Sequence, residues 1–163
     1  MKDINVLIRR YRDDIVICGR GIQVLGIWEI LKIMILVFWD HSVDNILFDE
    51  VTDENEIIIF KTVVYITIIL FCLFFSFWFI YIGQRAIKYG KGNSNKKYFL
   101  VVTAFCAVVI ALGIPQYFTG EVRDISDTEF ISVIVDITLT ILMIQLIYST
   151  IKVGSLEKKI RQV

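Results

Sequence analysis

Long apolar stretches alternate with polar connections along this chain, and they predict helices that cross a membrane. Four stretches reach about 20 residues, the length that a helix needs to cross a hydrocarbon core of roughly 30 Å. A backbone in lipid must satisfy its own hydrogen bonds, so we expect each stretch to be helical. The predicted spans cover residues 21–39, 57–82, 98–118 and 130–153.

The first 20 residues follow a different pattern. Apolar side chains recur at spacings of three and four, which places them on one stripe of a helix, and most charged residues fall off this stripe. We expect an amphipathic helix that lies in the membrane interface before the first span. A disordered segment, or one that packs in an oligomer, is the alternative. The stripe consists of Ile4, Leu7, Ile8, Tyr11 and Ile15.

These patterns predict an all-α integral membrane protein, a four-helix transmembrane bundle preceded by an amphipathic interfacial N-terminal helix. Its parts are the cytoplasmic helix 1–20, the four-span domain 21–153 and the cytoplasmic tail 154–163. No cleavable signal peptide is evident, because residues 1–20 carry charges throughout and lack a compact apolar core. We expect Pro115 to end or bend the third span.

Composition agrees with a membrane location. Hydrophobic residues make up 56% of the chain, whereas about 45–50% is usual for soluble domains. The formal net charge is zero, and the basic residues flank the apolar stretches instead of gathering on one region. This distribution argues against a nucleic-acid partner. The abundance of Ile, Lys, Asn and Phe is compatible with a bacterial source.

The distribution of charge predicts the orientation. Of the 17 basic residues, 14 lie before the first span, between the second and third spans, or at the end of the chain. Only Arg123 lies in the other two connections, which hold 11 acidic residues. Basic residues accumulate on the cytoplasmic side, so we expect a multi-pass protein of the cell membrane with both termini in the cytoplasm. We interpret the acidic connections as solvated outer loops, and a vestibule that attracts cations is the alternative.

Four charged residues fall within the spans, namely Glu29, Lys32, Lys61 and Asp136. Each costs roughly 2.5–3.5 kcal/mol on insertion scales, so each requires an explanation. Lys32 and Asp136 lie about 10 Å and 9 Å below the outer ends of their spans, and Glu29 shares a helix face with Lys32. We expect these three to form a charge cluster, which Lys61 joins unless it extends to the outer loop.

The cluster has a structural and a functional interpretation. Paired charges neutralise one another and fix how helices are rotated, or they bind a transported ion or substrate. Other polar residues are weaker signals. We expect Thr138 and Thr140 to bond to carbonyls of their own helix. Gly19, Gly21 and Gly26 leave room for a neighbouring helix, and the three cysteines are interpreted as small apolar packing residues.

The sequence contains no enzyme motif. It has one histidine, no paired cysteines at redox or metal spacing and no phosphate-binding loop, so we expect no catalytic residue, metal site or cofactor. The preferred interpretation is a non-catalytic membrane component that oligomerises or binds another membrane protein within the bilayer. The alternative is a small transporter or channel subunit that uses the charge cluster of Glu29, Lys32 and Asp136.

Overall fold

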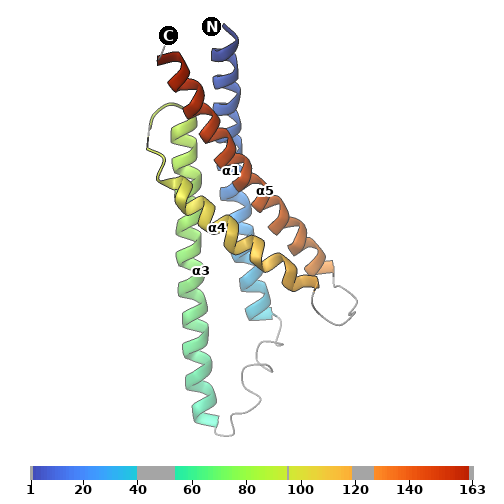
Figure 1. The fold of residues 1–163 in the computed structure, drawn as a ribbon. Coiled ribbons are helices and arrows are strands. Elements are labelled where there is room, and N and C mark those ends of the chain that lie inside the picture. Colours follow the sequence, from blue (N-terminus) through green and yellow to red (C-terminus); the bar gives the residue numbers. More distant parts are fainter. Residues whose placement is uncertain (1, 40–53, 95, 119–126, 162–163) are drawn as a thin grey trace.

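The computed structural model describes residues 2–39, 54–94, 96–118 and 127–161. All regular structure in these ranges is helical, as predicted. The elements are α1 (Lys2–Trp39), α3 (Glu54–Gly90), α4 (Phe99–Gly113), the 3-10 turn η1 (Ile114–Phe118) and α5 (Asp127–Arg161). Both termini lie at one end of the molecule, which we call the terminal end, and the opposite end is called the loop end (Figure 1).

Helix α1 joins two segments that the sequence analysis treats separately. The predicted boundary between residues 1–20 and 21–39 is not a break, since one helix runs from Lys2 to Trp39. No proline interrupts this stretch, and its glycines lie in contacts between helices instead of turns. The amphipathic segment is therefore the first half of a long helix, and its position in the membrane interface stays a prediction.

Two helices in the described part of the chain are long and apolar enough to cross a membrane. They are Ile58–Gly90 within α3 and Phe130–Ile160 within α5. Helix α4 is apolar but has 15 residues, and α1 carries charged residues along its length. Length and composition of the described helices thus identify two potential spans, where the sequence analysis predicts four.

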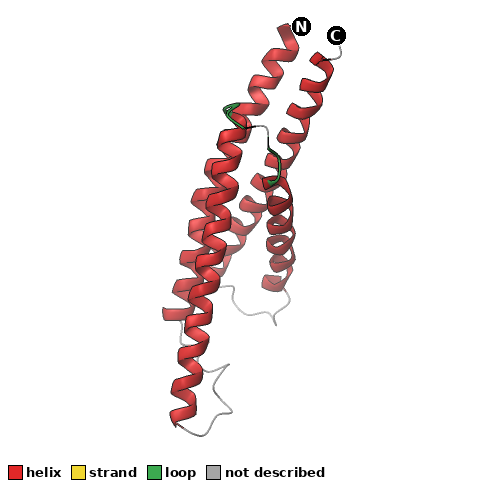
Figure 2. Cartoon of the chain, turned by 90° about the vertical axis from the view of Figure 1, so that its left-hand side faces the viewer, coloured by secondary structure: helices red, strands yellow, loops and turns green. Residues whose placement is uncertain are grey.

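Helices α1 and α5 reach the terminal end, and α3 and α4 pack against them farther from that end (Figure 1). Helix α1 packs against α3 and α5, and α4 packs against α5 and α3. At the loop end, the beginning of α3 extends past the other helices (Figures 1 and 2). Most of the fully buried apolar side chains lie in the terminal half, including Ile15, Cys18 and Ile22 of α1, Ile82 and Ala86 of α3, Phe99 of α4, and Met143, Leu146 and Val153 of α5.

Two glycines bring the backbones of α1 and α3 into contact. A Cβ atom on Gly83 would lie 2.6 Å from the carbonyl oxygen of Gly19, and a Cβ atom on Gly19 would lie 3.1 Å from the carbonyl oxygen of Gly83. Small residues permit this close approach between membrane helices. The room that the sequence predicts beside Gly19 and Gly26 is filled by α3, with the ring of Phe79 lying against Gly26.

The third predicted span ends as the sequence indicates. Helix α4 stops at Gly113, and the chain continues as the 3-10 turn η1, which contains Pro115. Proline has no N–H group to donate to the preceding turn and its ring crowds that turn. The proline therefore marks the change from α-helix to tighter winding.

Candidate functional site

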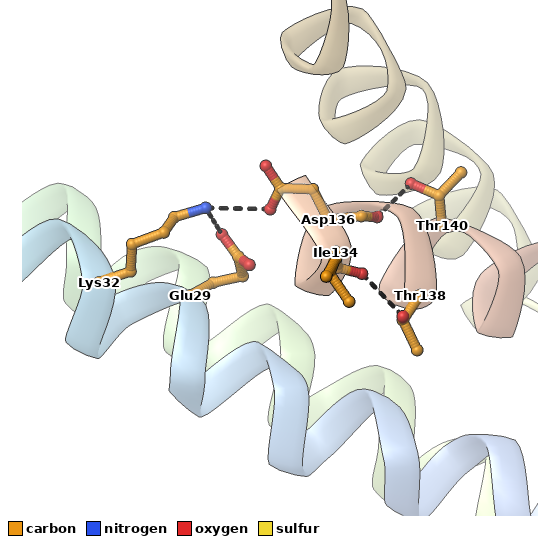
Figure 3. A network of polar contacts seen from close by, with 6 residues as sticks. All are labelled: Glu29, Lys32, Ile134, Asp136, Thr138 and Thr140. Carbon is orange, nitrogen blue, oxygen red and sulfur yellow. Dashed lines mark hydrogen bonds and ion pairs between the residues drawn. The ribbon is translucent and has the colours of Figure 1, made fainter. Parts of the chain in front are cut away.

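Helices α1 and α5 bring Lys32 and Asp136 together, although 104 positions separate them in the sequence. The Lys32 Nζ atom donates a hydrogen bond to Asp136 Oδ1 at 3.0 Å (Figure 3). The sequence analysis expects this contact from depth alone, because one span runs outward and the other inward. The structure confirms that the two residues meet.

Glu29 completes the cluster from the same helix as Lys32. One turn of helix places the two side chains on one face, and Lys32 Nζ lies 2.6 Å from Glu29 Oε2. The three side chains, which we call the charged triad, are largely shielded from solvent: 12% of Glu29, 17% of Lys32 and 8% of Asp136 is exposed. One ammonium group thus serves two carboxyl groups.

Two threonines near the triad bond to their own helix. Thr140 Oγ1 donates to the carbonyl oxygen of Asp136 at 2.8 Å, and Thr138 Oγ1 donates to that of Ile134 at 2.7 Å (Figure 3). Both contacts confirm the sequence prediction. Bonds of this kind often bend a helix, and here they satisfy both hydroxyl groups within α5 beside the triad.

Three further predictions concern Lys61, the acidic connections and the expectation of no metal site. Lys61 lies half-buried on α3, and its membership of the cluster stays a prediction. The acidic connections fall largely on residues 40–53 and 119–126, outside the described residues. Among the described residues, no three of His, Cys, Asp and Glu are grouped closely enough to hold a metal ion.

A second polar group, which the sequence analysis missed, joins α1 to α5 at the terminal end. Arg12 Nη2 donates to Glu157 Oε1 at 2.8 Å, and 37% of each side chain is exposed. Lys97 lies over the ring of Tyr89, with its ammonium nitrogen 5.7 Å from the ring centroid. The sequence feature that could have indicated this ion pair is Glu157, the only acidic residue in the basic tail 154–163.

The end of α3 positions Arg12. Gly92 has a φ angle of +77°, which L side chains rarely adopt. Its N–H donates to the carbonyl of Tyr89, and the N–H of Asn93 donates to the carbonyl of Lys88, as in a Schellman motif. A Cβ atom on Gly92 would lie 3.2 Å from Arg12 Nη1. The guanidinium group therefore lies near a helix C-terminus, where cations are favoured.

The cysteines behave as packing residues. Cys18, Cys72 and Cys106 are all free and buried. Burial, with a smaller contribution from the negative charge of Asp14, raises the pKa of the Cys18 thiol. A thiol with a raised pKa is a poor nucleophile at neutral pH, in agreement with the structural interpretation of this residue.

Comparison of the chain with models of protein families, with curated proteins and with solved structures finds no match in any of the three.

Proposed function

We propose that this chain is a four-span protein of the cell membrane, with both termini in the cytoplasm, and that it acts without catalysis as a self-associating membrane component. In this arrangement the terminal end faces the cytoplasm. Helices α1, α3 and α5 are each longer than 30 residues and extend beyond a hydrocarbon core of about 30 Å. The charges within α1 are accommodated because the triad pairs them with α5.

The observation that carries the proposal is an exposed apolar seam on α3. Its residues recur at alternating spacings of four and three, the pattern along which two helices pack side by side in a left-handed crossing. It covers 22 residues, or roughly 32 Å of helix, which is the full thickness of the hydrocarbon core. The α3 seam consists of Ile59, Val63, Ile66, Leu70, Leu73, Phe77 and Ile80, all exposed.

The α3 seam lies on the less buried of the two potential spans. An exposed stripe of similar length runs along α5 from Phe130 to Ile151, and helix α4 has a shorter one from Val101 to Leu112, which covers only about 17 Å. A contact across the whole bilayer provides more of the close packing that associates helices in lipid. The seam is also uncharged, so a second copy can approach it in parallel without repulsion.

The test is native mass measurement in nanodiscs, combined with labelling of single cysteines in a cysteine-free background. We expect a defined homo-oligomer that Leu70→Ala with Phe77→Ala converts to a monomer. The matched control is Leu112→Ala with Phe130→Ala, which removes the same side chains from equally exposed positions off the seam. A monomeric parent protein contradicts self-association, and an equal loss of oligomer in both variants contradicts the α3 seam as the interface. Membrane-impermeant reagents should label residue 155 only from the cytoplasmic side and residue 42 only from outside.

A small transporter or channel subunit is the second candidate. The charged triad favours it, because paired charges inside a membrane protein often mark an ion pathway. An outward-opening cavity in the homo-oligomer would support this candidate, whereas a stoichiometric second protein in the native mass would support a partner-binding component.

A further inference from the structure

The terminal end gathers more hydrogen-bond donors than acceptors around one carboxylate. Arg12 donates to Glu157 through Nη2 at 2.8 Å, whereas its Nε is enclosed without a hydrogen-bond partner among the described residues. The hydroxyl group of Tyr89 is enclosed and unpartnered in the same way, and only 5% of this residue is exposed. Buried polar groups in native structures almost always have a partner. Two unsatisfied groups that can donate therefore indicate a shortage of acceptors at this end.

The turn after α3 brings these groups to one place. A Cβ atom on Gly90, the neighbour of Tyr89, would lie 2.8 Å from the carbonyl oxygen of Arg12. A Cβ atom on Gly92 would lie 3.2 Å from Arg12 Nη1. Lys97 joins them from the connection between α3 and α4, with its ammonium nitrogen 5.7 Å from the centroid of the Tyr89 ring. Two cations and a phenol thus lie at the same turn.

The ammonium group of Lys97 also reaches α5. A Cβ atom on Gly154 would overlap Lys97 Nζ, so a glycine at this position gives the ammonium group its place. Gly154 and Glu157 are three residues apart and share one face of α5. Arg12 and Lys97 therefore meet the same face of α5, where two positive charges stand against one negative charge.

The surrounding sequence does not balance the second cation. The connection 91–98 contains lysines but no Asp or Glu, and the first turn of α4 contains no acidic residue. The two acidic residues that follow Arg12 fall about 100° and 200° around α1 from it. The Tyr89 ring lies beside Phe99, the first residue of α4, at 6.0 Å between centroids, and a helix N-terminus is partially positive. Excess positive charge and excess donors together favour phosphate, which carries negative charge and accepts hydrogen bonds.

Nearby tyrosines place this site at the level of lipid headgroups. In the membrane placement of the proposed function, tyrosines and basic residues mark the cytoplasmic boundary of the hydrocarbon core. The Lys152 ammonium nitrogen lies 5.4 Å from the centroid of the Tyr148 ring, and this ring lies 6.2 Å from that of Tyr11. Tyr11 directly precedes Arg12 in α1. Lys152 lies two positions before Gly154 in α5, so the boundary is within about one helical turn of the site.

We propose that Arg12 and Lys97 bind the phosphate group of one anionic phospholipid of the cytoplasmic leaflet, where the turn after α3 meets α5. Basic sites between membrane helices on this side are suited to anionic headgroups. Lys97 is an exposed, flexible side chain over the Tyr89 ring, so its movement opens the way to the two enclosed donors. One phosphate charge brings two cations and one carboxylate to a net charge of zero. The inference rests on the membrane placement in the proposed function and not on self-association.

Native mass measurement of the full chain in a neutral detergent tests the proposal, because bound lipids are counted singly and no charged surface attracts them. The delipidated wild-type protein should bind one phosphatidylglycerol per chain at concentrations at which phosphatidylcholine, which has no net charge, stays unbound. Inorganic phosphate in excess should not displace the lipid, because it lacks acyl chains. Equal binding of the two lipids overturns the proposal. Displacement by inorganic phosphate assigns the site to free phosphate and overturns the lipid assignment.

Two adjacent lysines locate the site. Lys97→Gln removes a cation that contacts the phosphate, so the affinity for phosphatidylglycerol should fall about tenfold or more, as expected for a hydrogen bond to a charged group. The matched control Lys96→Gln removes the same charge from an exposed neighbouring position and should lower the affinity by less than about fivefold. Equal losses in the two variants, or no loss in Lys97→Gln, overturn the assignment.

The same experiment separates this proposal from the proposed function. Native mass also gives the oligomeric state, so a monomer that binds phosphatidylglycerol selectively contradicts self-association alone. Cysteine labelling reports membrane orientation, so a correctly inserted chain without selective lipid binding contradicts the lipid site alone.

Discussion

Two ion pairs join α1 to α5, one at each end of the molecule, and their surroundings differ. At the terminal end, Arg12 and Glu157 meet at 2.8 Å with 37% of each side chain exposed. Toward the loop end, Lys32 and Asp136 meet at 3.0 Å with 17% and 8% exposed. The distances are nearly equal, so distance alone does not rank the two contacts. Solvent screening of the terminal pair makes its contribution small.

Helix packing also differs between the two ends of the molecule. In the terminal half, all four helices contribute to one apolar core, and the backbones of α1 and α3 touch at Gly19 and Gly83. Toward the loop end, α3 extends beyond the other helices (Figure 1). Most of its large apolar side chains between Ile58 and Phe77 are exposed. The terminal end is therefore held by packing with an accessory ion pair, whereas the charged triad is the specific contact between α1 and α5 toward the loop end.

Removal of the central cation should have the largest effect. Lys32→Met removes the ammonium group that contacts both buried carboxyl groups, Glu29 and Asp136, and removing one partner from a buried ionic contact costs about 3–5 kcal/mol. We expect the free energy of unfolding in mixed micelles to fall by this amount. The triple variant Glu29→Leu, Lys32→Met and Asp136→Leu should recover most of the loss, because apolar replacement of a whole buried ionic group is often neutral.

A loss below about 1 kcal/mol for Lys32→Met is within the range of an exposed ion pair. Such a result would contradict the conclusion that the triad contributes more to stability than the exposed pair at the terminal end. Activity or oligomeric state, measured on the triple variant, separates scaffold from function. A variant that is stable but no longer functional would assign the triad a role beyond holding helices in register.

The close contact of α1 with α3 should be the next most sensitive feature. Gly83→Ala would place a methyl group against the carbonyl oxygen of Gly19 and the side chain of Gln23. Overpacking of this kind costs about 1–3 kcal/mol, measured by the same unfolding assay. Gly113→Ala on α4 is the matched control, because no atom lies within 4 Å of its added Cβ atom. Equal effects of the two substitutions would show that helix propensity, and not the helix contact, determines the result.

Much of this arrangement could be predicted from sequence. Apolar length located the helices, and the opposite directions of two spans brought Lys32 and Asp136 to one level. Helix ends were less predictable, since α1 runs through the predicted boundary between residues 20 and 21, and α5 continues to Arg161. Charged residues there end the apolar pattern without ending the helix, because charged side chains are compatible with helical backbone in water.

The terminal ion pair could not be predicted in the same way. Arg12 is one of five basic residues before the first span, and its partner depends on the rotation of three helices about their axes. Rotation is determined by core contacts such as Ile15 and Val153, and by the turn at Gly92 that places the end of α3 beside Arg12. Periodicity identifies an apolar face but not the position of its neighbours.

The terminal ion pair should give the smallest effect. A double-mutant cycle of Arg12→Ala and Glu157→Ala should yield a coupling energy of about 0.2–1 kcal/mol, because both side chains are partly exposed. The cycle is needed because Arg12 also packs beside Gly92, and the single variant loses that packing too.

Salt separates this pair from the triad. Exposed charges are screened over about 10 Å at 0.1 M salt and about 3 Å at 1 M, so the coupling between Arg12 and Glu157 should fall toward zero as salt rises. The coupling between Lys32 and Asp136, measured by an equivalent cycle, should change little over the same range. Equal salt sensitivity at the two sites would mean that water reaches the triad as freely as the terminal pair, and the distinction between an accessory contact and an enclosed one would then be lost.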